Sequence, residues 1–362
     1  MHITNQKLIE WGWKPFWDFH FHPDEYPGCH PARVIRGIRN HYLIRTENGE
    51  QPAVLSGKFR HAATASSDTP VVGDWVVILP GGPSGKAVIQ NLLPRRSKFS
   101  RNAAGRSIQE QIIAANIDTV FIVSGLDQNY NLRRIERTLT LAWESGASPV
   151  ILLNKTDLCP DVMQVRKEVE STAPGVEVFA ISARERTGID AFSPYLAAGE
   201  TVALIGSSGV GKSTLINTLL GSDRQQVGAV RVKDGRGRHI TSVRELLILP
   251  GGGMIIDTPG LRELQLWSEG PGLETAFQDI RQLGVSCRFK DCSHTDEPGC
   301  EVLKAAADGR LSPDRLASYQ KLLKEQSYHL TKVSRSARQS RKAQYKRTMK
   351  QAHIIRRIKE KS

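Results

Sequence analysis

The pattern of apolar and polar positions changes near residue 99 of the chain. Before that point, residues 32–95 contain five short apolar segments separated by turn-forming residues such as "ENGE" and "PGGPSG". This pattern predicts a small closed β-barrel of the oligonucleotide-binding (OB) type. After it, apolar strands alternate with helical segments, as is typical of a parallel sheet covered by helices. Because ligands bind such a sheet at the carboxyl ends of its strands, residues that follow each strand are candidate site residues.

A glycine-rich segment follows one of these strands, "TVALI", and precedes the helical "TLINTLL". It fits G-x-x-x-x-G-K-[ST], in which backbone N–H groups surround phosphates, the lysine reaches the β and γ oxygens and the hydroxyl coordinates Mg²⁺. A glycine turn with only a structural role is the alternative, and the lysine and serine in register argue against it. The predicted phosphate-binding residues are Gly206, Ser207, Ser208, Gly209, Val210, Gly211, Lys212, Ser213 and Thr214. Lys212 is also a candidate catalytic residue.

The segment "DTPG" follows the strand "MII" about forty residues later. Its position predicts Asp257 near the Mg²⁺ and the N–H of Gly260 near the γ-phosphate. The preceding "DGRGRHITSVREL" is a predicted switch segment, ordered by the γ-phosphate. Within it, Thr241 is the candidate second hydroxyl ligand of Mg²⁺, beside Ser213, and a surface threonine is the alternative.

The guanine-reading motif "NKTD", residues 154–157, comes about fifty residues before the phosphate loop. Asn154, Lys155 and Asp157 form it, and the Asp157 carboxylate can accept from the N1–H and N2 amine of guanine, which adenine lacks. Ser182 and Ala183, after the strand "VFAI", are predicted to supply a backbone N–H to guanine O6. Ordinary Ras-like GTPases begin with the phosphate loop instead. The motif order therefore predicts a circularly permuted GTPase, a rearrangement that a parallel sheet tolerates.

A cluster of cysteines and one histidine lies near the C-terminus, with the spacing C-x4-C-x-H-x5-C. Three thiolates and an imidazole complete a tetrahedral Zn²⁺ shell with no open position, which predicts a structural metal site. The alternative is three reduced cysteines beside a surface histidine. The candidate ligands are Cys287, Cys292, His294 and Cys300. Because the number of cysteines is odd, Cys29 and Cys159 are predicted to be reduced thiols.

Two further features concern RNA. The N-terminal "WGWKPFWDFHF" is rich in aromatic residues, which could stack on bases, although we expect them to pack against the barrel. OB barrels need not bind nucleic acid, but basic residues here favour RNA binding: Arg33, Arg36, Arg45, Lys58 and Arg60.

The positive charge of the chain is concentrated at its C-terminal end. Lys and Arg number 50 against 37 Asp and Glu, a net +13, and residues 332–362 hold twelve basic residues and one acidic residue. That tail carries +11 of the +13 and predicts a polyanionic partner, since closely spaced cations gain from counterion release on nucleic acid. A solvated helix that aids solubility is the alternative. No apolar run has the length of a membrane helix or a signal peptide, so we expect a cytoplasmic protein with no membrane partner.

The motif order, "NKTDL", "GSSGVGKSTLIN", "GRGRH", "DTPG" and "CRFKDCSHTDEPGC", resembles that of the ribosome small subunit-dependent GTPase A family. The resemblance covers the chain from about residue 30 to the end. It implies an OB-type barrel, a permuted α/β GTPase and a mainly α-helical zinc-binding domain, with GTP or GDP, Mg²⁺ and one Zn²⁺ as ligands. The predicted segments are an N-terminal extension (1–30), the barrel (31–98), the GTPase domain (99–270), the zinc-binding domain (271–330) and the basic tail (331–362).

The resemblance also implies a function in late maturation of the 30S ribosomal subunit, with 16S rRNA as a contact and subunit-stimulated hydrolysis by a protein that we expect to be a monomer. Leu261 stands where Ras-like proteins have the glutamine that positions water, and the resemblance gives that catalytic role to His239. The family usually continues this histidine with consecutive threonines, whereas Ile240, Thr241 and Ser242 follow it here.

Two other functions stay open: an RNA-binding assembly protein with negligible turnover, and a permuted GTPase acting on another RNA or a translation factor. The cysteine cluster begins within about thirty residues of Gly260. We hypothesise that this proximity lets the nucleotide state reposition the zinc-binding domain and the tail against RNA.

Overall fold

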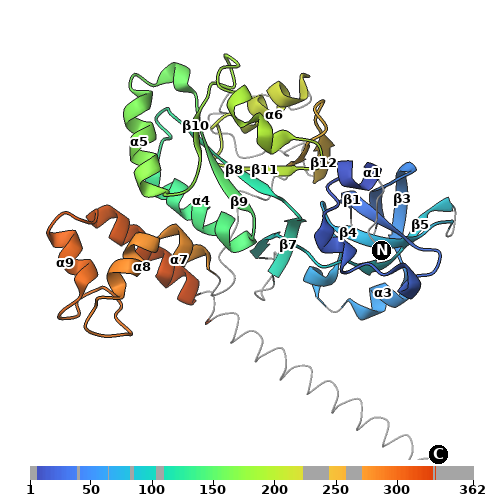
Figure 1. Ribbon diagram of the computed structural model, residues 1–362, viewed down its shortest axis with the longest axis horizontal. Helices are drawn as coiled ribbons and strands as arrows, with labels where there is room; N and C mark the ends of the chain where they lie inside the picture. Colours follow the sequence, from blue (N-terminus) through green and yellow to red (C-terminus); the bar gives the residue numbers. More distant parts are fainter. Residues whose placement is uncertain are drawn as a thin grey trace, which may run out of the picture.

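The structure is a computed structural model, and its arrangement of elements is seen in Figure 1. It describes residues 6–38, 41–63, 65–81, 85–102, 110–222, 244–257, 271–328 and 331. A central α/β domain separates an N-terminal barrel from a C-terminal group of helices, and these two units lie at different ends of it.

The N-terminal barrel contains the five strands that the sequence predicts. These are β1 (His30–Ile38), β2 (His41–Thr46), β3 (Gly49–Leu55), β4 (Trp75–Leu79) and β5 (Ala87–Leu92). Strand β1 pairs with both β2 and β4, and β3 runs parallel to β5, so the order β1-β2-β3-β5-β4 closes on itself. Ser56 ends the third apolar segment, because its hydroxyl caps helix α3 (Gly57–Ala62) by accepting from the Phe59 N–H.

The aromatic N-terminal extension packs against the barrel, as expected. It contains the short helices α1 (Gln6–Glu10) and α2 (Pro15–Asp18) and the 3₁₀ turn η1 (Pro23–Glu25). Trp13, Trp17 and Phe21 are buried together with Trp75 of β4, and the Trp13 and Trp75 rings meet edge to face at 4.8 Å. Phe19 is the exception, with 71% of its surface exposed.

The central domain is built on a sheet in the order β10-β9-β8-β11-β13-β12. Its strands are β8 (Thr119–Gly125), β9 (Ser148–Asn154), β10 (Val178–Ala180), β11 (Thr201–Ile205), β12 (Glu245–Ile248) and β13 (Met254–Asp257). All pairings among them are parallel except that of β12, which runs antiparallel to β13. The strand β11, fourth of the six in chain order, lies between β8 and β13 in the middle of the sheet.

Helices cover both faces of this sheet. They are α4 (Leu132–Ser145), α5 (Val162–Thr172) and α6 (Lys212–Leu220), with the 3₁₀ segments η4 (Thr156–Leu158) and η5 (Asp190–Leu196). The apolar residues of α4 and α5 belong to one core, which continues into the C-terminal helices, whereas those of α6 and η5 belong to another. The sheet is therefore buried on both sides, which explains why its strands read as continuous apolar runs.

A buried arginine joins the barrel to the central domain. The Arg33 guanidinium, 1% exposed, donates to the Thr201 hydroxyl at 2.9 Å and to the carbonyls of Asn116 and Trp11. Burial lowers its pKa to about 10, against the opposing charges of neighbouring carboxylates, so it keeps its charge at neutral pH. Nearby, β1 pairs with β12, where Arg36 forms an ion pair with Glu245.

The sequence did not predict three of the strands. The antiparallel pair β6 (Lys98–Asn102) and β7 (Glu110–Ala115) leads from the barrel into the central domain. Strand β12 contains Glu245 and Leu246, the last two residues of the predicted switch segment. The predicted switch segment therefore overlaps, at its C-terminal end, a short strand that lies between β13 and β1.

The C-terminal helices pack on α4. They are α7 (Gly272–Ala276), α8 (Gln278–Gly284), α9 (Glu301–Ala307) and a further helix over residues 313–328. A Cβ at Gly272 would lie only 2.5 Å from the Thr140 carbonyl oxygen of α4, so α7 can approach α4 this closely only with glycine there. Leu273 and Phe277 continue the apolar core of the central domain into this unit.

Candidate functional site

The phosphate loop joins β11 to α6, as the sequence predicts. Two of its glycines are required by close contacts: a Cβ at Gly206 would lie 2.3 Å from the Val123 carbonyl oxygen, and one at Gly211 would lie 2.3 Å from the Asn154 Nδ2. Gly211 also has φ +97°, which other residues rarely adopt. The loop thus ends at the N-terminus of α6, where backbone N–H groups favour an anion.

Lys212 lies at the first position of α6 and turns back over the loop. Its Nζ donates to the carbonyl oxygens of Gly206 at 2.7 Å and Ser207 at 2.6 Å. This places the ammonium charge across the loop in which phosphates would be held. Ser213 and Thr214 follow on the first turn of α6, Val210 is buried, and Ser208 and Gly209 are exposed at the tip of the loop.

Asn154 connects three of the predicted motifs. Its side chain is almost fully buried, with Nδ2 donating to the Val210 carbonyl at 2.8 Å and Oδ1 accepting from the Ala183 N–H at 2.9 Å. One carboxamide therefore fixes the spacing between the guanine motif, the phosphate loop and the Ser182-Ala183 turn. The structure thus brings together motifs that lie more than fifty residues apart in sequence.

The remaining guanine-motif residues also have partners. The Ser182 hydroxyl donates to Asp157 Oδ1 at 2.6 Å, and the Ser182 backbone N–H donates to the Thr187 carbonyl. Since the Ala183 N–H already donates to Asn154, it could bond guanine O6 only as a donor shared between the two acceptors. A cavity of about 290 Å³ opens beside the turn, lined partly by Ala183, Thr214 and Asn217.

Lys155 adopts a left-handed backbone conformation, with φ 68°, and reaches back to the loop before α4. Its Nζ donates to Asp127 Oδ2 at 2.6 Å. Burial alone would raise the pKa of Asp127, but hydrogen bonds led by that from Lys155 hold the pKa below its ordinary value. The pair fixes the loop before α4 beside the guanine motif.

Two residues near the site were not predicted from the sequence. One is Asp127, and the other is Arg134 of α4, whose Nη1 donates to the Ser207 hydroxyl of the phosphate loop at 3.1 Å. Their position along the chain could have indicated them. Both follow β8, which pairs in parallel with β11, so the segment after β8 emerges at the same edge of the sheet as the phosphate loop.

Asp257 ends β13, the other neighbour of β11, at the edge of the sheet that carries the phosphate loop. The predicted switch residues His239 and Thr241 and the γ-phosphate contact Gly260 lie outside the described residues. The same holds for the basic tail, except for Thr331.

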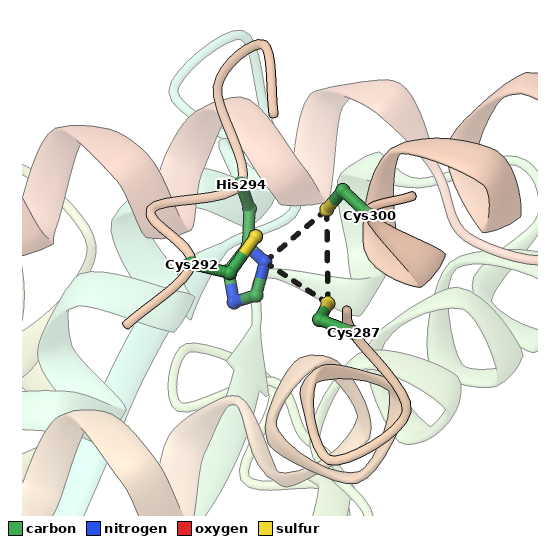
Figure 2. Close-up of side chains that lie close together, drawn as sticks. All are labelled: Cys287, Cys292, His294 and Cys300. Atoms are coloured by element: carbon green, nitrogen blue, oxygen red, sulfur yellow. Dashed lines mark hydrogen bonds between the residues drawn. The ribbon is translucent and has the colours of Figure 1, made fainter. Parts of the chain in front are cut away.

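The four candidate metal ligands lie together in the C-terminal unit (Figure 2). Their ligand atoms all lie within 4.8 Å of one another. The Cys287 and Cys300 sulfurs are 3.8 Å apart, and His294 Nδ1 lies 3.4 Å from the Cys300 sulfur. A disulfide needs about 2.05 Å, whereas a tetrahedron with Zn–S bonds of about 2.3 Å has edges of about 3.8 Å, so this donor set fits zinc.

Three of the five basic barrel residues named in the sequence analysis contact other parts of the protein. Arg33 is buried and points into the domain junction, and Arg36 is paired with Glu245. Arg45 pairs with Glu50 and lies over the Trp11 ring, 3.4 Å from its centroid. Lys58 and Arg60, on α3, are exposed.

The fold and the site together define a circularly permuted P-loop GTPase, in which the guanine motif precedes the phosphate loop along the chain. A family model described as RsgA GTPase matches residues 92–267. The chain is 44% identical to the "Small ribosomal subunit biogenesis GTPase RsgA" of Opitutus terrae, over 90% of this chain and 91% of that protein. It is 46% identical to a protein of the same name from Methanosarcina acetivorans, over 81% and 80% of the two chains.

Solved structures agree with these relatives. YjeQ from Thermotoga maritima matches with a TM-score of 0.62 and 27% identity, over 82% of this chain and 98% of that one. YloQ, described as a circularly permuted GTPase, matches in fold with a TM-score of 0.61 and 22% identity, over 85% and 98%. The chain belongs to the RsgA GTPase family, which confirms the resemblance seen in the sequence, and it is a GTP-hydrolysing enzyme. Membership implies GTP and GDP as ligands together with Mg²⁺.

Replacement of Gly211 by alanine tests the close packing of the phosphate loop on Asn154. The new methyl group would overlap Asn154 Nδ2 in a backbone conformation that costs about 1 to 3 kcal/mol for other residues, so GDP affinity should fall about tenfold or more. The measurement is a titration with a fluorescent GDP analogue. Gly175→Ala is the control, because Gly175 has φ +78° but nothing within 4 Å. An equal loss in both variants would mean that general destabilisation of the chain, and not the local packing of Gly211 on Asn154, sets the effect.

Proposed function

We propose that this enzyme binds the small ribosomal subunit, acts late in its maturation and hydrolyses GTP faster when bound to it. The observation that carries the proposal is the bridging of the guanine motif and the phosphate loop by Asn154, which builds one nucleotide site from the permuted motifs. The names of the relatives support the ribosomal role. The domain boundaries predicted from the sequence are part of the proposal.

In the proposed site, Asp157 selects guanine and the backbone of residues 206–211 holds the phosphates. Lys212 would exchange its contacts with loop carbonyls for contacts with β and γ oxygens. Ser213, on the helix after β11, and Asp257, at the end of the paired strand β13, lie at one edge of the sheet and offer oxygen ligands that suit Mg²⁺. Mg²⁺ bound there would neutralise the charge that develops on the phosphates.

Water activation is assigned to His239, with Thr241 as the second magnesium hydroxyl and the Gly260 N–H as the γ-phosphate contact. Leu261 has no polar group with which to orient water, which supports a different residue in that role. A subunit that completes the site could then accelerate hydrolysis, as activating partners do for other GTPases.

Cys287, Cys292, His294 and Cys300 are proposed to hold one structural Zn²⁺ in a mainly helical domain. The fit of their spacing to a tetrahedral shell supports this. The surrounding helices also hold the ligand loop: Gln320 donates to the His294 carbonyl, and the Cys300 sulfur accepts from the Leu303 N–H at the start of α9. The metal would thereby link this loop to α9.

The basic tail is proposed to contact 16S rRNA, supported by its +11 charge. The proposal includes a monomer working in the cytoplasm. No helix among the described residues has both the length and the apolar character needed to span a bilayer.

GTP hydrolysis measured with purified 30S subunits, 50S subunits or neither tests the ribosomal proposal. We expect 30S alone to stimulate the rate, by on the order of 10³ to 10⁵ if it completes the site as other activators do. His239→Ala should keep GTP affinity but lose this stimulation. Stimulation by neither subunit would favour an RNA-binding assembly protein, and preference for 50S or another RNA would favour a different target.

Metal analysis of the purified chain tests the zinc site. We expect about one Zn²⁺ per chain, lost in a Cys292→Ala variant and kept in Cys159→Ser, whose thiol lies outside the cluster. Removal of the metal should lower the thermal unfolding temperature of the C-terminal unit. A chain that contains no zinc and unfolds identically with and without a chelator would contradict the proposal.

A further inference from the structure

Helix α4 contacts the nucleotide site and the C-terminal unit through different sides. It follows β8 and lies beside α7 in Figure 1. Residues three and four apart share a face of a helix, whereas adjacent residues are separated by about 100°. At 100° per residue, Arg134 and Glu136 lie about 160° apart on opposite sides of α4, and Arg133 and Arg137 lie between them.

The start of α4 is held against the nucleotide motifs at two points. Arg134 Nη1 donates to the Ser207 hydroxyl at 3.1 Å and to the Asn129 carbonyl at 3.2 Å. Two residues before Asn129, Asp127 receives the hydrogen bond from Lys155 of the guanine motif. Ser207 is also the residue whose carbonyl accepts from Lys212. The phosphate loop is thus held at one residue by Lys212 from α6 and by Arg134 from α4.

The other side of α4 is bound to the C-terminal helices by charged pairs. Arg315 donates to Glu136 at 2.9 Å and forms two hydrogen bonds with Asp279 of α8, at 2.6 and 2.8 Å. The Glu136 and Arg315 side chains are only 4% and 10% exposed, so this contact is desolvated and geometrically restricted.

Two more ion pairs extend this contact along the helix. Arg137 makes a two-pronged contact with Glu325, and Arg133 pairs with Asp314. Both acidic partners lie on the helix over residues 313–328, in the unit that carries the candidate zinc ligands. A displacement of α4 would therefore change its contacts with the phosphate loop and its contacts with the C-terminal helices.

We propose that Arg134 is a positioning residue of the GTPase site, through which α4 couples the phosphate loop to the docking of the C-terminal unit. The inference rests on the nucleotide site proposed above. The coupling does not depend on the short chain distance between Gly260 and the cysteine cluster. It runs through contacts that lead from Ser207 through Arg134 and α4 to Arg315 and Glu325. Because such coupling is reciprocal, docking of the C-terminal unit changes nucleotide affinity by the same factor as nucleotide binding changes the docking equilibrium.

The test is a double-mutant cycle on GDP affinity in the full chain, with a fluorescent GDP analogue as probe. Glu325→Ala removes the partner of Arg137 at a partly exposed pair, so the fold should be kept, as checked by circular dichroism. We expect it to weaken GDP binding about fivefold in the otherwise unchanged chain and to have no effect in an Arg134→Ala background. Arg134→Lys should restore part of the coupling, because lysine retains a donor at that position.

Glu170→Ala is the matched control, since it breaks a comparable arginine–glutamate pair, with Arg166, that lies within α5. It should leave GDP affinity unchanged in both backgrounds. Equal effects of Glu325→Ala with and without Arg134, or no effect in either, would overturn the coupling. Because this titration uses no ribosomal subunit, a negative result would not bear on the ribosomal proposal. In the same way, a failure of 30S subunits to stimulate hydrolysis would not bear on the coupling through Arg134. If the unchanged chain bound no GDP, the nucleotide site itself would be wrong.

Discussion

The proposed nucleotide site depends on one buried carboxamide, that of Asn154. Asn154 donates to the Val210 carbonyl of the phosphate loop and accepts from the Ala183 N–H, and its Nδ2 lies so close to residue 211 that only glycine fits there. A buried polar group must satisfy its hydrogen bonds, so this side chain fixes the positions of both partners. These hydrogen bonds depend only on where the three motifs lie in space, and not on the order in which the motifs occur along the chain. A permuted chain can therefore assemble the same guanine and phosphate contacts.

The sheet supplies the frame for this contact. Strand β11 pairs with β8 on one side and β13 on the other, so the loops that carry Asp127, the phosphate loop and Asp257 emerge at one edge. A buried arginine extends this sheet into each neighbouring unit: Arg33 joins the barrel to it through hydrogen bonds, and Arg315 joins the C-terminal helices to α4 through ion pairs. Each of these arginines has several acceptors, which restricts the geometry of its domain contact.

The elements that the sequence predicted are those with strong local signals. The five barrel strands have turn residues between them, and the phosphate loop has its required glycines and lysine in register. Contacts between domains have no such signal. Arg33 alternates along β1 with Ala32 and Val34, which face the barrel core, so it faces the neighbouring domain instead of RNA. The sequence shows that Arg133 and Arg134 would lie about 100° apart on a helix, but not which surfaces they meet. His239, Thr241 and Gly260 stay predictions.

The central claim is that the permuted motifs form one guanine-specific site, and Asp157→Asn tests it most directly. A carboxamide at this position offers an N–H where guanine presents its N2 amine, and would instead suit the oxygen that xanthine has there. Equilibrium titration of GDP and xanthosine diphosphate against both chains is the measurement. We predict that the variant binds the xanthine nucleotide more tightly than GDP, reversing the original preference. Unchanged GDP affinity in the variant would contradict the account.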